Sequence, residues 1–245
     1  MKKLILFLAI IACALSVSAQ DSFYIYKKDG SVIYYTISTV DSISFTKPTN
    51  APDTTNTTDT VVVINGVKWA TRNVAIPGKF TTNSYDAGDF YQWNSKVGWP
   101  ATGNIGSITA TDGSTTWNSS WEGGYTSPSD TDWTSANDPS PAGWRVPTYA
   151  EIQTLLDATK VTSAWTMQNS VYGEKFTDKT SANSIFLPAL GYRGYNTSDG
   201  TFGIAGSFGG YWCGRPNRAL YFNGGGAGSD YYYLDCGFSV RPVAK

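Results

Sequence analysis

Short apolar runs, separated by turns of glycine, asparagine and serine, occupy most of this 245-residue chain. Near its start, residues 23–26 (FYIY) and 32–35 (VIYY) flank an Asp-Gly dipeptide. Two apolar runs around such a turn predict a β-hairpin. Residues 42–45 alternate polar with apolar side chains, which predicts a third short strand. Residues 20–45 are therefore expected to form a small β-module, too short to bury a core of its own.

A second hairpin and one helix stand out further along the chain. Val61–Ile64 and Val67–Ala70 flank an Asn-Gly dipeptide, which favours a type I′ turn. Thr148 and Glu151 have the spacing of a capping box directly after a proline, which predicts the start of a helix. Its apolar face would be formed by Ile152, Leu155 and Leu156. The remainder alternates short strands with turns, so we expect an α+β fold that is β-rich with few helices, preceded by the small β-hairpin module.

The first nineteen residues have the order of features found in export signals. Two lysines precede an apolar run at 4–15, and small residues follow up to residue 19. This order predicts a signal peptide at 1–19, with cleavage before Gln20. The run is shorter than the roughly 20 apolar residues that a membrane-spanning helix needs. The alternative is a lipoprotein, because the Ile-Ile-Ala-Cys sequence ending at Cys13 resembles a lipobox.

The composition of residues 46–60 differs from that on either side. This segment reads TKPTNAPDTTNTTDT and contains no aliphatic residue larger than alanine. Such a composition is typical of a linker. Residues 61–245 contain no second segment of this kind, and their length suits a single hydrophobic core. We therefore expect a linker at 46–60 and one domain at 61–245.

Charge and residue usage narrow the partners and the chemistry. Charged residues make up 15% of the chain and the net charge is −1, whereas nucleic-acid binding needs clustered lysines and arginines. The chain has no histidine, which is the commonest general base and metal ligand. We therefore expect a protein that is not an enzyme and that uses no metal or cofactor. Its partner would be an extracellular protein or glycan, with no nucleic acid and no membrane span.

Four local patterns occur in an order known from one family of bacterial proteins. They are GVKWATRNV at 66–74, GDFYQW at 88–93, PAGWRVPT at 141–148, and GGYW at 209–212 together with GFSVRPV at 237–243. In order and spacing they resemble the Fibrobacter succinogenes major paralogous (FISUMP) domain family over nearly all of residues 61–243. That family is similar to the C-type-lectin-like superfold, so the resemblance implies a C-type-lectin-like fold and export from the cytoplasm. It implies no single activity, because the superfold contains binding proteins as well as formylglycine-generating enzymes.

The tryptophans divide into two groups. Those within the motifs are expected in the core, because large aromatic side chains dominate the burial of a β-rich domain; they are Trp69, Trp93, Trp144 and Trp212. Three others fall in an insertion rich in glycine, serine and threonine, and are better candidates for a ligand groove. These are Trp117, Trp121 and Trp133.

Cys213 and Cys236 remain once the signal peptide is removed. An exported protein can form disulfides. Cys213 follows one motif strand and Cys236 precedes another, so the two sulfurs could form a structural disulfide if these strands lie side by side. Closing that loop would contribute about 3 kcal/mol. The alternative comes from the resemblance, because formylglycine-generating enzymes use a cysteine pair for catalysis.

Between these cysteines the chain reads CGRPNRALYFNGGGAGSDYYYLDC. Tyrosine, serine, glycine and asparagine are the residues that antibody loops use for binding, and arginine adds bidentate donors. We expect one contact face formed by Arg215, Asn217, Arg218, Tyr221, Asn223, Tyr231, Tyr232, Tyr233 and Asp235. The segment also resembles the variable region of a C-type-lectin-like protein diversified by a retroelement, since randomised adenines in AAC-type codons reach most of these residues. An ordinary polar hairpin with glycine turns is the alternative.

The leading hypothesis is a non-enzymatic ligand-binding or adhesion module in the periplasm, on the outer-membrane surface or outside the cell. Two alternatives stay open at this point. One is a catalyst related to the formylglycine-generating enzymes, and the other is a structural component of fimbriae or of a matrix.

Overall fold

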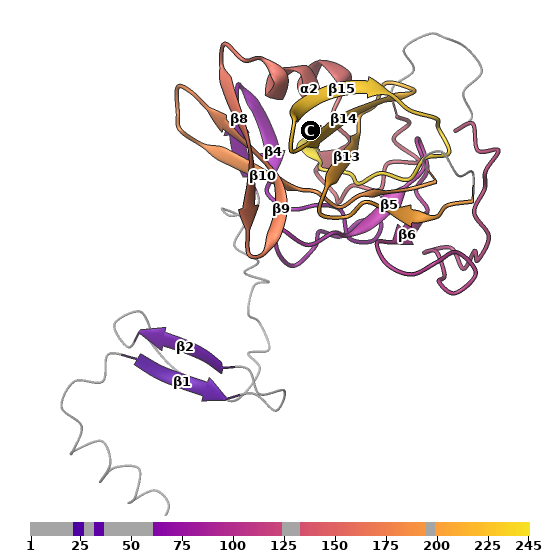
Figure 1. Cartoon of the computed structure of the whole chain (residues 1–245), viewed down its shortest axis with the longest axis horizontal. Coiled ribbons are helices and arrows are strands. Elements are labelled where there is room, and N and C mark those ends of the chain that lie inside the picture. Colours follow the sequence, from indigo (N-terminus) through magenta and orange to yellow (C-terminus); the bar gives the residue numbers. More distant parts are fainter. Residues whose placement is uncertain (1–21, 27–31, 37–60, 124–132, 195–198) are drawn as a thin grey trace, which may run out of the picture. The chain divides into compact units, whose positions relative to one another are not determined.

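The computed structural model describes residues 22–26, 32–36, 61–123, 133–194 and 199–245 (Figure 1). The chain divides into two compact units, Met1–Thr54 and Thr55–Lys245, and this division falls inside the expected linker. The predicted signal peptide, the third short strand at 42–45 and the linker at 46–60 lie outside the described residues. Within the described ranges, no helix has the length and apolar character needed to cross a membrane.

The first unit contains one antiparallel strand pair. Strand β1 (Ser22–Tyr26) pairs with β2 (Val32–Thr36), so that Ser22 lies opposite Thr36 and Tyr26 opposite Val32. The pairing of the two apolar runs predicted around the Asp-Gly dipeptide is therefore confirmed.

The second unit begins and ends in the same sheet. Its strand order is β3-β4-β16-β7, formed by β3 (Val61–Ile64), β4 (Val67–Ala70), β16 (Val243–Ala244) and β7 (Trp144–Arg145). Asn65 and Gly66 have φ angles of 45° and 81°, as the predicted type I′ turn requires. Val243 pairs with Trp69, so the last strand of the unit closes onto one of its first.

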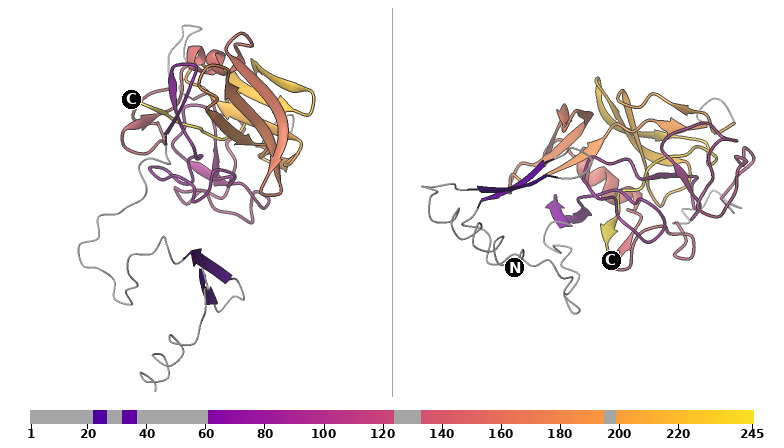
Figure 2. Two further views of the ribbon diagram at one scale, coloured as in Figure 1. Left: turned by 90° about the vertical axis from the view of Figure 1, so that its left-hand side faces the viewer. Right: turned by 90° about the horizontal axis from the view of Figure 1, so that it is seen from below.

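The other strands form small antiparallel sheets. The larger two have the orders β10 (Ser184–Pro188), β9 (Val171–Asp178), β8 (Val161–Gln168) and β13 (Phe208–Trp212), β14 (Arg218–Asn223), β15 (Gly226–Tyr231). Two-stranded sheets pair β5 (Asp89–Tyr91) with β6 (Gly98–Pro100) and β11 (Tyr192–Arg193) with β12 (Phe202–Gly203). The β8–β9–β10 sheet lies beside the β13–β14–β15 sheet, and helix α2 (Tyr149–Leu156) contacts both (Figures 1 and 2). The described residues thus form a β-rich structure with one short helix.

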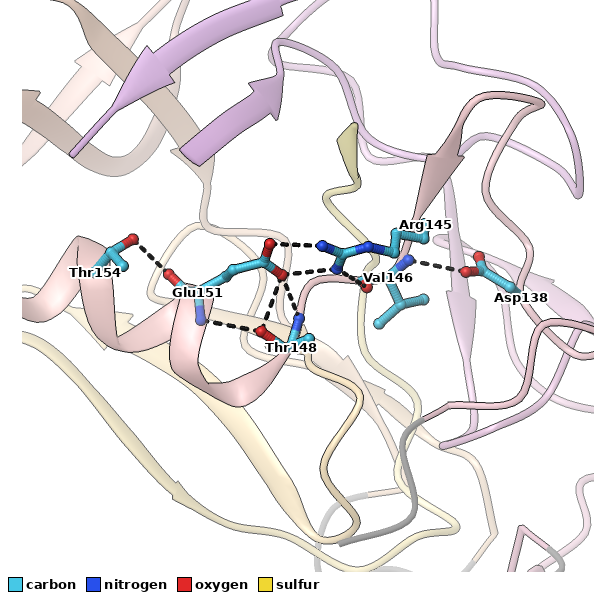
Figure 3. Close-up of polar contacts among 6 residues, drawn as sticks. All are labelled: Asp138, Arg145, Val146, Thr148, Glu151 and Thr154. Atoms are coloured by element: carbon cyan, nitrogen blue, oxygen red, sulfur yellow. Dashed lines mark hydrogen bonds and ion pairs between the residues drawn. The ribbon is translucent and has the colours of Figure 1, made fainter. Parts of the chain in front are cut away.

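Helix α2 begins where the capping pattern predicts (Figure 3). Thr148 Oγ1 accepts a hydrogen bond from the Glu151 amide at 3.2 Å, and Glu151 Oε2 accepts one from the Thr148 amide at 2.7 Å. These two bonds satisfy backbone donors that a helix N-terminus would otherwise leave open. Ile152 and Leu155 are buried, so the predicted apolar face is confirmed at both positions.

Two further charged residues connect this helix start to the chain before it. The guanidinium of Arg145 forms two bonds with the Glu151 carboxylate, at 2.7 and 2.6 Å. The carboxylate of Asp138 accepts hydrogen bonds from the amides of Ser140 and Val146, at 2.8 and 3.0 Å (Figure 3 shows the bond to Val146). The loop before α2 is therefore held by its own polar side chains.

The buried tryptophans include two that the sequence analysis expects in a ligand groove. Trp69, Trp93 and Trp212 are buried as expected, while Trp144 is half-buried. The expectation of a groove at Trp117 and Trp133 is wrong, because their side chains are only 6% and 7% exposed.

Ring packing accounts for the burial of these two residues. Trp117 packs against Trp99, with ring centres 5.3 Å apart, and Trp133 packs against Trp93 at 5.9 Å. Gly200 fits closely over Trp117, since a Cβ atom at that glycine would lie 2.5 Å from the indole ring. The insertion therefore completes the core through its tryptophans.

Two arginines are fully buried and bind loops together. Arg193 donates hydrogen bonds to the carbonyl oxygens of Pro100, Thr102 and Gly200, at 2.6 to 3.0 Å. Arg241 donates to Asn73 Oδ1 at 2.8 Å and also to two backbone carbonyl oxygens. Such bonds are what a buried guanidinium needs to offset the loss of water.

Candidate functional site

Residues 213–236 contain the turn after β13, the β14–β15 hairpin and the turn that leads into the closing segment. Strand β13 lies at one edge of the β13–β14–β15 sheet. On the side away from β14 it is joined to the closing segment, because Tyr211 forms a parallel bridge with Ser239. The Trp212 amide donates to the Ser239 carbonyl at 3.0 Å. The hairpin is therefore carried by strands that are built into the core.

The two faces of this sheet separate the nine residues predicted to form one contact face. Successive side chains of a strand point to opposite sides, so Arg218 and Tyr221 of β14 lie on different faces. Leu220 and Phe222, on the same face as Arg218, belong to the core cluster that includes residues of α2 and of the β8–β9–β10 sheet. Tyr221 packs against the other large cluster. The prediction of a single face is therefore wrong.

On the α2 face, two arginines lie against two tyrosine rings. The Arg218 guanidinium carbon lies 3.4 Å from the ring centre of Tyr231, its cross-strand partner, and 5.4 Å from that of Tyr149. The guanidinium carbon of Arg215 lies 5.3 Å from the same Tyr149 ring. Each distance is within the range of cation–π attraction. We name Tyr149, Arg215, Arg218 and Tyr231 the Arg–Tyr cluster.

Tyr149 was absent from the sequence prediction, although it is the ring that joins both arginines. It is the first residue of α2, and its hydroxyl lies 3.3 Å from Ser229 Oγ on β15. Gln153, one turn further along the helix, donates to the same oxygen at 3.1 Å. The contact between Tyr149 and Ser229 joins parts of the chain that are 80 residues apart, so no local pattern predicts it. The capping box at Thr148 predicts only that a helix begins here.

Three consecutive tyrosines at the end of β15 alternate between exposed and buried side chains. The side chains of Tyr231, Tyr232 and Tyr233 are 64%, 8% and 71% exposed. The Tyr232 ring lies 4.8 Å from that of Phe238 in an edge-to-face arrangement, and its amide donates to the Asn217 carbonyl at 2.9 Å. The assignment of Tyr232 to the contact face is therefore wrong, and its exposed neighbours remain candidates.

Tyr221 has a packing role on the face away from α2. Its ring stacks on that of Phe208, with centres 6.3 Å apart and planes 4° apart. The side chain remains half-buried, so only part of it reaches solvent.

The two asparagines of the predicted face shape turns. Asn217 has a φ angle of 59° in the turn before β14, a left-handed conformation that asparagine tolerates better than most residues. Asn223 Oδ1 accepts a hydrogen bond from the Gly225 amide at 2.8 Å, which closes the turn between β14 and β15. Both side chains are half-buried.

Asp235 lies in the turn after the tyrosines and is also half-buried. Its backbone carbonyl accepts a hydrogen bond from Gln92 Nε2 at 3.0 Å. Burial raises the pKa of its carboxyl group above the ordinary value. The backbone of Asp235 therefore ties this turn to the residue that follows β5.

The structure contains Cys213 and Cys236 as buried thiols, so the disulfide considered between them is not formed. The strands do lie side by side, but they run parallel. With Tyr211 opposite Ser239, Cys213 lies two residues beyond the bridge and Cys236 three residues before it. In extended parallel strands this offset corresponds to about 16 Å, whereas bridged Cα atoms lie within about 7 Å.

The environments of the two thiols differ. The Cys213 thiol lies 3.2 Å from the carbonyl oxygen of Arg218, to which it donates. Burial raises the pKa of the Cys236 thiol to about 12, and the negative charge of Asp235 acts in the same direction. A thiol with such a pKa is protonated at neutral pH, and the thiol is a much weaker nucleophile than the thiolate.

A separate open cleft of about 660 Å³ lies outside the segment 213–236. It is lined by Ile76, Pro77, Lys96, Val97, Thr111 and Asp112. No group of three or more cysteine, aspartate or glutamate side chains is arranged to hold a metal ion in the part of the chain that the structure describes.

The motif resemblance to the FISUMP family remains a prediction, and so does the C-type-lectin-like fold that it implies. The structure supports the coarser class, a β-rich α+β protein with one short helix among its described residues. No protein-family model, no curated protein and no solved structure matches the chain.

Proposed function

We propose that residues 61–245 form an exported, non-enzymatic ligand-binding or adhesion module with the C-type-lectin-like fold that its motifs imply. The contact surface consists of the Arg–Tyr cluster together with Tyr233. The observation that carries this proposal is the exposure of Tyr231 and Tyr233 on either side of a buried tyrosine. Large aromatic side chains gain free energy by leaving water, and tyrosine and arginine dominate the energetics of interfaces.

The backbone that carries this surface is ordered by strand pairing and by core packing, which favours binding. Tyr231 ends strand β15 and pairs with Arg218 through the backbone, while Tyr232 anchors the chain in the core. Ligand contacts on such a scaffold lose little conformational entropy, because the backbone is already ordered and tyrosine has only two side-chain torsions. The surface is therefore organised before a ligand arrives.

The cysteine environments support this proposal over a catalyst of the formylglycine-generating type. A nucleophilic cysteine requires an accessible thiolate. Cys236 is buried with its pKa raised to about 12, and Cys213 is buried with its thiol hydrogen-bonded to a carbonyl. Both thiols are therefore held in a poorly reactive form.

We also propose that a retroelement diversifies this protein, and that the variation is confined to exposed positions of residues 213–236. Tyr232, Leu234 and Cys236 are core residues, so unrestricted variation from 213 to 236 would disrupt packing. Variation restricted to positions such as Tyr231 and Tyr233 would leave the core intact. A reverse-transcriptase gene and a near-copy of the 3′ end in the neighbouring DNA would support the proposal, and their absence would overturn it.

The binding proposal is tested with the mature chain on a glycan array and on surface proteins presented at known concentration. Tyr231→Ser and Tyr233→Ser together should weaken binding by at least about tenfold. Tyr172→Ser is the matched control, because Tyr172 is an exposed tyrosine on β9 in the other large sheet. Equal losses in the control and the test variant would place recognition elsewhere. Concentration-dependent self-association without an external ligand would instead support a structural component.

A further inference from the structure

We propose that the Arg–Tyr cluster binds the oxyanion of an acidic glycan, with a carboxylate or sulfate against the guanidinium groups and a sugar ring against the exposed tyrosines. This inference rests on the proposed function, because it names the ligand class for the same surface. Four observations carry it: the unpartnered guanidinium of Arg218, the absence of a competing acid among the described residues, the fixed position of Tyr149 and the exposure of Tyr231.

The guanidinium of Arg218 is unlike those of the buried arginines. Its Nε is buried without a hydrogen-bond partner, and the guanidinium makes no hydrogen bond or ion pair with any residue that the structure describes. Arg193 and Arg241 direct their donors to carbonyl and amide oxygens. A buried donor without a partner lowers stability. The charge of this guanidinium therefore has no counterion among the described residues, and a ligand oxyanion would supply one.

No carboxylate of the described residues competes for Arg218. Asp230 is the nearest acid along β15, but it pairs with Ala219 and its side chain therefore lies on the opposite face of the sheet. Its carboxylate accepts a hydrogen bond from the Tyr231 amide at 2.8 Å. The acid nearest the start of α2, Glu151, is engaged by Arg145 and by the helix cap.

Tyr149 holds the two positive charges on one ring. Both Arg215 and Arg218 lie over it, and Ser229 fixes its hydroxyl to β15. The two guanidinium charges beside this ring repel each other, and a bound oxyanion would offset that repulsion. A guanidinium also matches the two oxygens of a carboxylate or sulfate in a bidentate arrangement.

The exposed tyrosines favour a glycan over an acidic peptide. Arg218 covers one face of the Tyr231 ring at 3.4 Å, and 64% of this side chain remains open to solvent. Tyr233 adds a second exposed ring two residues away. A uronic acid or sulfated sugar carries an oxyanion and an apolar ring face on the same residue, so it can satisfy both groups. An aspartate or glutamate side chain supplies the oxyanion alone.

The experiment compares four probes by isothermal titration with the mature chain. They are an oligogalacturonate, a sulfated dextran oligosaccharide, a neutral galactan oligosaccharide of equal length and a polyglutamate peptide. The expected result is binding of at least one acidic glycan, weakened by salt, with the neutral glycan and the peptide at least about tenfold weaker. The first two probes distinguish a carboxylate from a sulfate ligand. Equal binding of the peptide, or of the neutral glycan, overturns the inference.

The variants separate this inference from the proposed function. Arg218→Gln should weaken the acidic glycan by at least about tenfold, and Arg218→Lys should restore only part of the loss because it lacks the planar fork. Arg72→Gln is the matched control, since Arg72 also lies over an aromatic ring, at 5.6 Å from Phe80. If Arg218→Gln fails to fold, Arg215→Gln tests the same site from its turn before β14.

Two results have distinct meanings. If both arginine variants bind acidic glycans as the wild type does, while substitution of Tyr231 and Tyr233 abolishes binding of another ligand, the oxyanion inference fails and the proposed function stands. If neither the arginine nor the tyrosine substitutions change binding of any ligand, both fail.

Discussion

Replacement of Tyr232 by alanine should destabilise the second unit far more than the same change at either neighbouring tyrosine. Tyr232 is 8% exposed, and its ring packs edge-to-face on Phe238 at 4.8 Å and near Phe208 at 6.5 Å. Truncation of a buried aromatic side chain typically costs about 3–5 kcal/mol. We expect about 3–4 kcal/mol here, because Tyr232 keeps a small exposed fraction. In a unit of this size, that loss lowers Tm by about 6–16 °C.

The neighbouring substitutions are the controls. Tyr233→Ala removes a side chain that is 71% exposed, so the free energy of unfolding should change by less than about 0.5 kcal/mol. Tyr231→Ala also removes the contact with Arg218, which is worth about 0.5–1 kcal/mol at an exposed site. Tyr232→Phe keeps the ring and should retain most of the stability.

Urea unfolding followed by tryptophan fluorescence measures these differences. All nine tryptophans lie within residues 61–245, so the signal reports on this unit. Equal midpoints for the Tyr232→Ala and Tyr233→Ala variants would refute the assignment of Tyr232 to the core. A larger loss at Tyr233 would refute the alternation of buried and exposed tyrosines on which the proposed contact surface is based.

Three further outcomes are expected from the structure. Thr148→Ala should lower the free energy of unfolding by about 1 kcal/mol through loss of the helix cap, and Thr148→Ser should not; an unchanged midpoint in the alanine variant would exclude the cap. Burial raises the pKa of Asp89 to about 6, despite the nearby charge of Arg193, so the folded carboxyl group binds a proton more tightly than the unfolded one, with its ordinary pKa of 3.8. Stability is therefore lost as the pH rises from about 4 to 6, and the gain from Asp89→Asn should grow over this interval in urea titrations; a gain independent of pH would contradict the assignment. Both buried thiols should react with a thiol reagent only after denaturation, and rapid reaction of Cys236 in the folded protein would contradict its burial.

Several elements of this fold could be predicted because they depend on neighbouring residues. The Asn65-Gly66 turn follows from the left-handed conformations that a type I′ turn demands. The start of α2 follows from two side chains, Thr148 and Glu151, that satisfy each other's backbone amides. In both cases the interacting groups lie within a few positions of each other.

The candidate site was predicted only in part, because strand alternation depends on where each strand ends. The composition of residues 213–236 predicts a contact face rich in tyrosine, and among its three consecutive tyrosines Tyr231 and Tyr233 reach solvent. Composition alone could not separate these two from Tyr232, which has the same side chain. The register of β15 against β14 decides which of them faces water.

By itself, the sequence determined the β-rich class and the local turns and caps. Only the tertiary structure decided that the segments containing Tyr211 and Ser239 run parallel, which separates Cys213 from Cys236. It also brought Tyr149 against Arg218. The physical reason is that local hydrogen bonds are fixed by adjacent residues, whereas the direction of a strand and the partner of a ring are set by how the whole core packs.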